Sequence, residues 1–475
     1  MIARSPDIAS VRAPRFLGGL LLALFLSACG GPLDFPHAEQ DLVILTYASG
    51  LNTEIKDGKI ADTDTPSGFE DEVLLMFAKE LGVSARFVIV PRHELRQRLA
   101  KHEGHLAAGW LFPIPDDTHS LASEPLLETR DVLVRHETSP QIDSLEQLIG
   151  QTVHAAQDSR QLRFLHQLKK QYPTLTVVSF PSDSALDLLG AVARQEVENA
   201  LVDSAELSMG LNFYPTLGSG LEIGDPHPVV WLFPPGGNPE LYERAQLFLA
   251  NLKEGKQLTV LNDRYFGHLK RLSATDISVF LFRMENLLPR YQALFQEAQL
   301  ETSFDWRLLA ALAYQESHWD PLNTSFTGVR GMMMLTGDTA DRMGVSNRLD
   351  PNESIMGGAR YLRLLKSYIP ADTPEPDRTW QALAAYNIGP GHFNAARRLA
   401  GHLGINGDSW FEMKRVLPLL ARPEYYDRLK SGRARGGEAV VMVENIRLFY
   451  DIMLHHLPPY LPSPQTHVEP EEIKG

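Results

Sequence analysis

The pattern of hydrophobic residues changes once along this chain of 475 residues, and that change most constrains its fold. Up to His268, short apolar runs alternate with helical patterns, as in LVILTY (42–47), FEDEVLLMFAKELG (69–82) and ARFVIV (85–90). From Asp276 onward every strong pattern is helical, with apolar residues recurring at intervals of three and four. The sequence therefore predicts a multi-domain protein, an α/β part followed by an all-α part.

The alternating part is expected to form parallel sheets with helices on their faces, in a domain at residues 41–268. Further strands are predicted at DVLVRH (131–136), TVHAA (152–156), LTVVSF (175–180) and VVWLF (229–233).

The helical part is expected to consist of a linker helix at 269–288 and a domain at 289–458. The tail at 459–475 is rich in proline and charge, which predicts disorder. The clearest helical segments are ISVFLFRMENLLPRYQALFQEAQ, WRLLAALAYQES, ESIMGGARYLRLLKSYI and TWQALAAYNIG.

The first 28 residues are interpreted as an export signal, because arginines precede the apolar run FLGGLLLALFL (16–26), which is too short to span a bilayer comfortably. The run ends in LSAC, and Cys29 is the only cysteine, so a structural disulfide within one chain is impossible. Residues 29–40 would then be a short tether. Cys29 can have a role of its own at the cleavage site; the alternative is an ordinary secretory signal in which the cysteine occurs by chance.

The charge balance excludes one class of partner. Lys and Arg number 45 against 59 Asp and Glu, a formal net charge of −14, so there is no basic stripe for phosphates and nucleic acid is not expected to bind. We expect no cofactor and no metal, since His455 and His456 lack further ligands at zinc-like spacing and are interpreted as a helix end.

The segment AYQESHWDP (313–321) places an acidic residue at the end of an apolar helical run. Ser303 or Asp305 can cap the start of this helix, and Glu316 falls on the same face as its core residues, which are Trp306, Leu309, Leu312 and Ala313. A carboxylate among apolar side chains has its pKa raised toward the value that a general acid needs. The alternative is a surface glutamate in a frayed last turn.

Two further segments carry candidate binding residues. In GVRGMMMLTGDTA (328–340), Met332, Met333 and Met334 cannot all face one core, so at least one is expected to line a groove or an interface; the alternative is a buried helix start. In AAYNIGPG (384–391), Tyr386 and Asn387 precede a helix terminus where a hydroxyl and an amide can meet a ligand, and a plain helix C-cap is the alternative.

These motifs, ES (Glu316, Ser317), GMMMLT (331–336) and AYN (385–387), resemble in their order the lysozyme-like domain of family 1 lytic transglycosylases. The resemblance runs from about residue 289 to about 457. It implies cleavage of the β-1,4 bond between N-acetylmuramic acid and N-acetylglucosamine in peptidoglycan, without water, leaving a 1,6-anhydro ring.

The resemblance also assigns roles to residues. Glu316 would act as acid and then as base, Ser317, Tyr386 and Asn387 would position the sugar and the acid, and backbone groups around Met333 and Met334 would bind N-acetyl amides. Many members have glutamine at the position of Met334, and the all-methionine form is typical of one branch of the family.

One departure from the family pattern bears on activity. The family usually has a tyrosine at the position of Met442, and a lost phenol would cost roughly 1–3 kcal/mol if it had been buried against a sugar. Tyr425 or Tyr426 could compensate. An alternative function is therefore a catalytically weak or inactive sensor lipoprotein that binds peptidoglycan or muropeptides.

The stretches GFEDEVLLMFAKELG, SLEQLIGQTVHAAQDS and ENALVDSAEL resemble family 3 solute-binding proteins of amino-acid transporters. That family usually clamps a ligand carboxylate with an arginine, but here His105 stands where an aspartate is expected and no arginine follows before Arg130. Asp203 matches the aspartate that holds a ligand's amino group, with a loop cap as the alternative. Because the arginine clamp is missing, the expected ligand is a muropeptide or peptide stem rather than a free amino acid held in the usual way.

The segment LSAC also resembles the lipobox of bacterial lipoproteins, which implies that Cys29 is acylated and anchors the protein in a membrane. Gly30, rather than aspartate, follows the cysteine. By resemblance to Gram-negative lipoproteins this favours the periplasmic face of the outer membrane.

Overall fold

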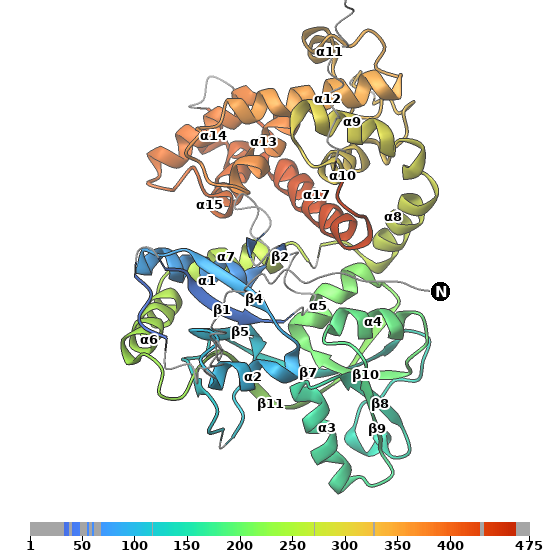
Figure 1. Ribbon diagram of the computed structural model, residues 1–475. Helices are drawn as coiled ribbons and strands as arrows, with labels where there is room; N and C mark the ends of the chain where they lie inside the picture. The colour runs from blue at the N-terminus through green and yellow to red at the C-terminus, as the bar shows by residue number, and fades with distance from the viewer. Residues whose placement is uncertain are drawn as a thin grey trace, which may run out of the picture.

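The computed structural model describes residues 33–37, 40–47, 68–115, 117–269, 271–325, 328–427 and 432–461, with the backbone of 55–56 and 59–60. The predicted signal, Cys29 and almost all of the predicted tail lie outside the described residues. In Figure 1 the α/β part occupies the lower half and the helical part the upper half. Among the residues described, no helix has both the length and the apolar character needed to cross a membrane.

The α/β part is built on one mixed sheet that runs through two lobes. Its strand order is β4-β1-β5-β11-β7-β10-β8-β9, and β6 pairs with β11; β2 and β3 form a separate hairpin. The strands are β1 (Leu42–Thr46), β2 (Ile55–Lys56), β3 (Lys59–Ile60), β4 (Ala85–Ile89), β5 (Leu106–Leu111), β6 (Leu121–Ala122), β7 (Leu127–His136), β8 (Thr152–Ala156), β9 (Thr176–Phe180), β10 (Asn199–Asp203) and β11 (Leu217–Phe233).

All six predicted strands are present, but the expectation of purely parallel sheets is wrong. Strand β1 pairs in parallel with β4 and β5, and β8 pairs in parallel with β9 and β10. Strand β11 is antiparallel to β5 and β7, and β7 is antiparallel to β10. The reason is that β7 and β11 are the long strands that carry the chain between the lobes, in opposite directions.

Helices cover both lobes of this sheet (Figure 1). Helix α1 places Glu70, Asp71 and Glu72 in its first turn and Lys79 in its last, an arrangement that suits the helix dipole. The helices of this part are α1 (Phe69–Leu81), α2 (Arg92–Ala100), α3 (Arg160–Gln171), α4 (Ala185–Ala193), α5 (Ser204–Phe213), α6 (Pro239–Glu254) and α7 (Gln257–Phe266).

The helical part is arranged around α10, which packs against α9 and α17. The long segment at 277–299 divides into α8 and α9 near Pro289, because proline cannot continue a helix interior. The helices are α8 (Ala274–Asn286), α9 (Gln292–Thr302), α10 (Trp306–Ser317), α11 (Gly337–Met343), α12 (Pro351–Ser367), α13 (Asp377–Ile388), α14 (Pro390–His402), α15 (Trp410–Val416), α16 (Pro423–Tyr426) and α17 (Gly436–His456).

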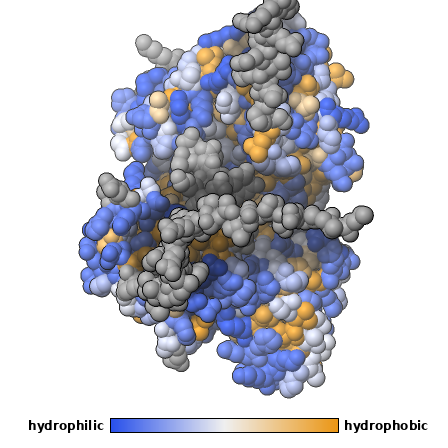
Figure 2. Space-filling view, viewed as in Figure 1, coloured by the Kyte–Doolittle hydropathy of each residue, from blue (hydrophilic) through white to orange (hydrophobic). Residues whose placement is uncertain are grey.

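Contacts at two places join the two parts. Near α7, the Lys414 ammonium lies 2.6 Å from an Asp263 carboxylate oxygen. Near α5, the ring of His455 stacks on Phe213 with centroids 4.1 Å apart. Figure 2 shows polar residues over most of one face of the molecule, with hydrophobic residues in small groups.

Candidate active site

Glu316 lies in the last turn of α10, whose start and end are both well defined. At the start, the Asp305 carboxylate accepts the N–H of Arg307 at 2.8 Å, so Asp305 is the cap. Ser303 instead ends α9, with a φ of 64°. At the other end, His318 adopts a left-handed conformation and its N–H donates to the Tyr314 carbonyl at 2.8 Å. The helix therefore holds its form through Glu316, and the alternative of a frayed last turn is wrong.

The Glu316 side chain is half-buried, and burial raises the pKa of its carboxyl to about 8. Its helix neighbours Trp306, Leu309 and Leu312 are fully buried. Among the described residues, neither a hydrogen-bond donor nor a cation contacts the carboxyl. The predicted direction of the pKa shift is confirmed, and its cause is desolvation alone.

The three consecutive methionines are divided between core and surface, as predicted. Met332 and Met333 are fully buried. Met334 is half-buried and has a φ of 47°, a left-handed conformation that is uncommon for a residue other than glycine. Met334 is thus the methionine whose side chain can line a groove.

Hydrogen bonds from three other elements fix this loop beside Glu316. The Ser317 hydroxyl donates to the Met332 carbonyl at 2.8 Å, and the Tyr386 hydroxyl donates to the Met333 carbonyl at 2.8 Å. The Met333 N–H donates to the Ser354 hydroxyl oxygen at 3.1 Å. Both backbone polar groups of Met333 are therefore engaged within the protein.

Tyr386 also lies close enough to Glu316 to respond to its charge. Burial, and then the negative charge of Glu316, raise the pKa of the Tyr386 phenol well above its usual value. The adjacent Asn387 is exposed. The structure therefore brings together Glu316, Ser317, Tyr386 and the methionine loop, while their substrate-binding roles stay predictions.

Sequence reasoning did not find Ser354 and Gly358, which both support the loop from α12. A Cβ atom on Gly358 would lie 2.6 Å from the Met333 Cβ, so α12 can approach the loop this closely only with glycine there. The available signal was the pair Gly357-Gly358 within a helical pattern, since glycine weakens a helix unless close packing requires it.

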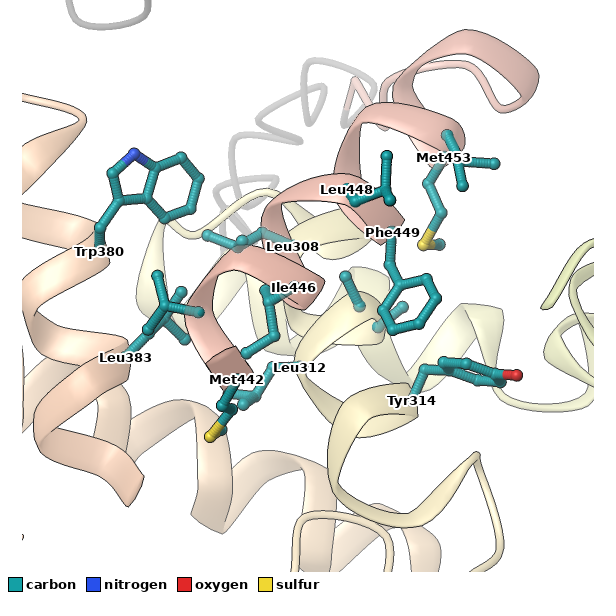
Figure 3. Packing of buried hydrophobic residues seen from close by; sticks show 14 of the residues in the cluster. Leu308, Leu312, Tyr314, Trp380, Leu383, Met442, Ile446, Leu448, Phe449 and Met453 are labelled. Atoms are coloured by element: carbon teal, nitrogen blue, oxygen red, sulfur yellow. The ribbon is translucent and has the colours of Figure 1, made fainter. Parts of the chain in front are cut away.

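Met442 occupies a different environment from the one that its family counterpart suggested. It is only 5% exposed and packs in the core of the helical part, beside Leu312 in Figure 3. A side chain so buried offers almost no surface to a sugar.

In the α/β part, Asp203 is the N-cap of α5, which confirms the alternative reading of this residue. Its Oδ1 accepts hydrogen bonds from the Thr129 hydroxyl at 2.7 Å and from the Ala205 N–H at 2.9 Å. Its Oδ2 lies 3.6 Å from the His227 Nε2. Burial, and then the Asp203 charge, raise the pKa of the neighbouring Glu206 to about 8. A ligand role for Asp203 remains a prediction.

His105 has a structural partner: its Nδ1 accepts the N–H of Val43 at 2.9 Å, which fixes the imidazole against β1. A cation that sequence reasoning missed lies elsewhere in this part. The Arg92 guanidinium lies 4.6 Å from the centroid of the Tyr47 ring. The backbone N–H of Arg92 donates to the Asp183 carboxylate of the other lobe at 3.2 Å.

Comparisons with known proteins agree with both parts. Residues 293–408 match the transglycosylase SLT domain, and residues 55–268 match the bacterial extracellular solute-binding proteins of family 3. The N-terminal half is also similar to an ancestral arginine-binding protein bound to arginine, with a TM-score of 0.43 and 19% identity, covering 49% of this chain and 100% of that one. The two family matches thus define a transglycosylase SLT domain that follows a solute-binding-like domain.

Two relatives match almost the whole chain. A membrane-bound lytic murein transglycosylase F of Methylobacillus flagellatus is 40% identical over 456 residues, which cover 94% of this chain and 96% of the relative. One of Nitrosospira multiformis is 38% identical over 466 residues, covering 96% of each. The chain belongs to the membrane-bound lytic murein transglycosylase F family.

Proposed function

We propose that this protein is a peptidoglycan lytic transglycosylase, which cleaves the β-1,4 bond between N-acetylmuramic acid and N-acetylglucosamine and leaves a 1,6-anhydromuramyl end. The observation that carries this proposal is the Glu316 carboxyl, which has a pKa of about 8, has no partner among the described residues and lies beside a loop fixed from three sides. The domains proposed for this activity and for ligand binding are residues 289–458 and 41–268.

Glu316 performs both proton transfers in this reaction. With a pKa of about 8 it is mainly protonated at neutral pH, so it can donate its proton to the glycosidic oxygen as that bond breaks. The resulting carboxylate then takes the proton of the sugar's C6 hydroxyl while that oxygen bonds to C1. The carboxyl ends the cycle protonated, as it began, and no water is consumed.

A single carboxylate suffices if the substrate supplies the second group. Most glycosidases use two carboxylates, with substrate-assisted enzymes as an exception. Asp320 is the nearest candidate in sequence, but it is exposed and its Oδ1 accepts the Leu322 N–H at 2.9 Å, which supports a capping role. The N-acetyl group of the muramic acid takes the second role.

The residues around Glu316 have two roles: some hold the methionine loop in place and others contact the substrate. Ser317 and Tyr386 act by fixing the methionine loop against α10, since their hydroxyl protons are donated to its carbonyls. Met334 and Asn387 contact the sugar, because Met334 is the loop methionine with exposed surface and Asn387 is exposed. N-acetyl recognition falls mainly to the Met334 carbonyl, since both polar groups of Met333 are engaged and the Met334 N–H donates to the Gly331 carbonyl at 3.1 Å.

The test is digestion of purified peptidoglycan by the full chain, by Glu316→Gln and by a matched control. We expect Glu316→Gln to lower the release of anhydro products by about 10²–10⁴-fold, measured by mass spectrometry. Glu297→Gln is the control, since Glu297 is exposed on α9 of the same part. Anhydro products from Glu316→Gln at the wild-type rate would refute the assignment.

The second candidate function is an inactive sensor that binds glycan, and it would be favoured if Met442 had removed a sugar contact. The burial of Met442 argues against that reading. Intact glycan that stays bound to the wild-type protein, with no anhydro product, would establish the sensor instead.

We also propose that Cys29 is acylated and holds the protein on the periplasmic face of the outer membrane. The support is the sequence LSAC with Gly30 after the cysteine, together with the membrane-bound description of the relatives. Incorporation of labelled palmitate that persists in Cys29→Ala, or wild-type protein in the soluble fraction, would contradict this proposal.

For the solute-binding-like domain we propose a muropeptide or peptide ligand with an amino group. The buried acids Asp203 and Glu206 suit a cationic group, and the raised pKa of Glu206 means that a ligand cation could stabilise its charged form. Calorimetry with stem peptides and free amino acids tests this, and tight binding of a free amino acid alone would overturn it.

A further inference from the structure

A small cavity with cationic side chains in its wall lies at the opposite end of α10 from Glu316. It is open to solvent, has a volume of about 250 Å³ and is lined by the turn between α9 and α10, the last turns of α12 and the start of α13. Helix α12 packs against both α9 and α13, so the walls belong to one rigid arrangement. Because α10 has 12 residues, a rise of about 1.5 Å per residue puts this cavity roughly 18 Å from Glu316.

The wall of the cavity carries three cations, Arg363, Lys366 and Arg378, of which Arg378 is unpaired. The Arg378 Nε is buried without a hydrogen-bond partner, and none of the described acids forms an ion pair with this guanidinium. Because no described acid neutralises Arg378, its guanidinium can bind an anion that enters the cavity. Thr302, Ser303 and Ser367 add hydroxyl groups to the same wall.

The other two cations are only partly neutralised. Lys366 pairs with Glu375 at 2.7 Å. Arg363 lies 3.8 Å from the Glu301 carboxylate, which is already held by Arg360 at 2.6 Å. Two carboxylates, those of Glu301 and Glu375, thus face four cations, which are Arg360, Arg363, Lys366 and Arg378. Two positive charges therefore remain here, in a protein whose net charge is −14.

We propose that this cavity binds a carboxylate, and that the carboxylate belongs to a peptide stem of the peptidoglycan strand on which Glu316 acts. A planar guanidinium matches a carboxylate, and a small cavity admits one such group rather than a sugar ring. The inference rests on the proposed function, since it takes peptidoglycan as the substrate.

The first experiment compares KM and kcat on two substrates, intact peptidoglycan and glycan strands from which an amidase has removed the stems. For the full chain carrying Arg378→Gln we expect KM on intact peptidoglycan to rise about tenfold with kcat unchanged. On stripped strands the variant should equal wild type. Arg378→Lys should restore part of the loss, and Arg290→Gln, at an exposed arginine of the same part, should have no effect.

The second experiment needs no turnover, so its failure can be distinguished from failure of the proposed function. A stem tetrapeptide with a photoreactive group is cross-linked to the full chain, and the modified residues are mapped by mass spectrometry. We expect labelling at 302–304 and 363–367 that falls at least tenfold in Arg378→Gln, and also when the peptide carboxyls are amidated.

Three outcomes would overturn the proposal. One is an equal loss on intact and stripped substrates, which indicates a structural role for Arg378. Another is no change in KM or labelling. The third is Arg378-dependent binding of inorganic phosphate or phosphatidylglycerol vesicles without binding of the stem peptide, which assigns the cavity to a phosphate.

Discussion

Glu316 is half-buried and Glu444 fully buried within the helical part, and their pKa values move in opposite directions. Glu316 has no partner, and burial raises its pKa to about 8. Burial would raise the pKa of Glu444 too, but Arg447 and then Lys414 reverse this effect and hold it at about 2. Glu444 accepts hydrogen bonds from Arg447 at 2.7 Å and from the Trp410 indole at 2.8 Å.

The difference teaches that burial disfavours the ionised form of a carboxyl, and that neighbouring cations decide whether the carboxyl nevertheless ionises. At Glu444 the cost is offset by two cations, and the ionised carboxylate fixes α15 against α17. At Glu316 it is not offset, and the carboxyl keeps a proton that it can transfer. The same residue type thus serves structure at one place and chemistry at the other.

The largest effect is expected at Glu444. Glu444→Gln leaves Lys414 and Arg447 without their carboxylate, so we expect the free energy of unfolding to fall by about 3–5 kcal/mol. Urea unfolding measures it, with Glu438→Gln as the control, because Glu438 is on the same helix in an exposed pair with Arg435. If Glu444→Gln kept its stability but lost turnover, Glu444 would serve the chemistry rather than the structure, and the comparison would be wrong.

The next effect concerns Met442, which shares α17 with Glu444. Met442→Tyr places a larger, polar side chain in a filled core, so we expect a destabilisation of about 1–3 kcal/mol and no gain in activity. Val441→Tyr is the matched control, since Val441 is 44% exposed. An activity gain from Met442→Tyr would mean that this position reaches the substrate after all.

The smallest effect is a difference in pH dependence between wild type and Glu316→Gln. Between the usual value of 4.5 and about 8, folded Glu316 holds a proton that the unfolded chain has lost, so wild-type stability falls as pH rises through this range. The glutamine variant lacks this loss. At pH 8 it should be more stable than wild type by on the order of 1–2 kcal/mol, and at pH 4 the two should agree.

Thermal unfolding at several pH values measures this difference. The pH dependence of stability has the opposite sign for Glu444, because the pKa of this carboxyl is lowered. The stability that its charge contributes is present above pH 4.5 and is lost as pH falls toward about 2. If the two glutamine variants changed stability over the same pH range, the contrast between the two sites would be wrong.

The sequence predicts α10 and Glu316 well because the information is local. A cap residue and an apolar face at helical spacing determine where the carboxyl lies. The glycine pair at 357–358 indicates close packing, but the partner in that packing could not be predicted, because Ser354 and Gly358 join a loop to a helix some twenty residues away through one hydroxyl and one missing side chain. Such contacts leave no periodic signal.

Strand β5 shows the same limit in the fold. Its sequence LAAGWL has no β-branched residue, so strand propensity does not favour it, yet all six residues are buried. Its position between β1 and β11 determines its conformation. The antiparallel pairing of β7 and β11 was missed for a related reason, since apolar patterns indicate strands but not their directions.

That position of β5 has a consequence for the order in which the protein can be assembled. One edge of β5 pairs with β1, which is synthesised early, but the other pairs with β11, which emerges only after the whole second lobe. A nascent chain in which β1, β4 and β5 have formed still presents an apolar strand edge to other chains. This intermediate therefore needs protection until β11 has been synthesised, and a chaperone that covers residues 106–111 would act at its most exposed point.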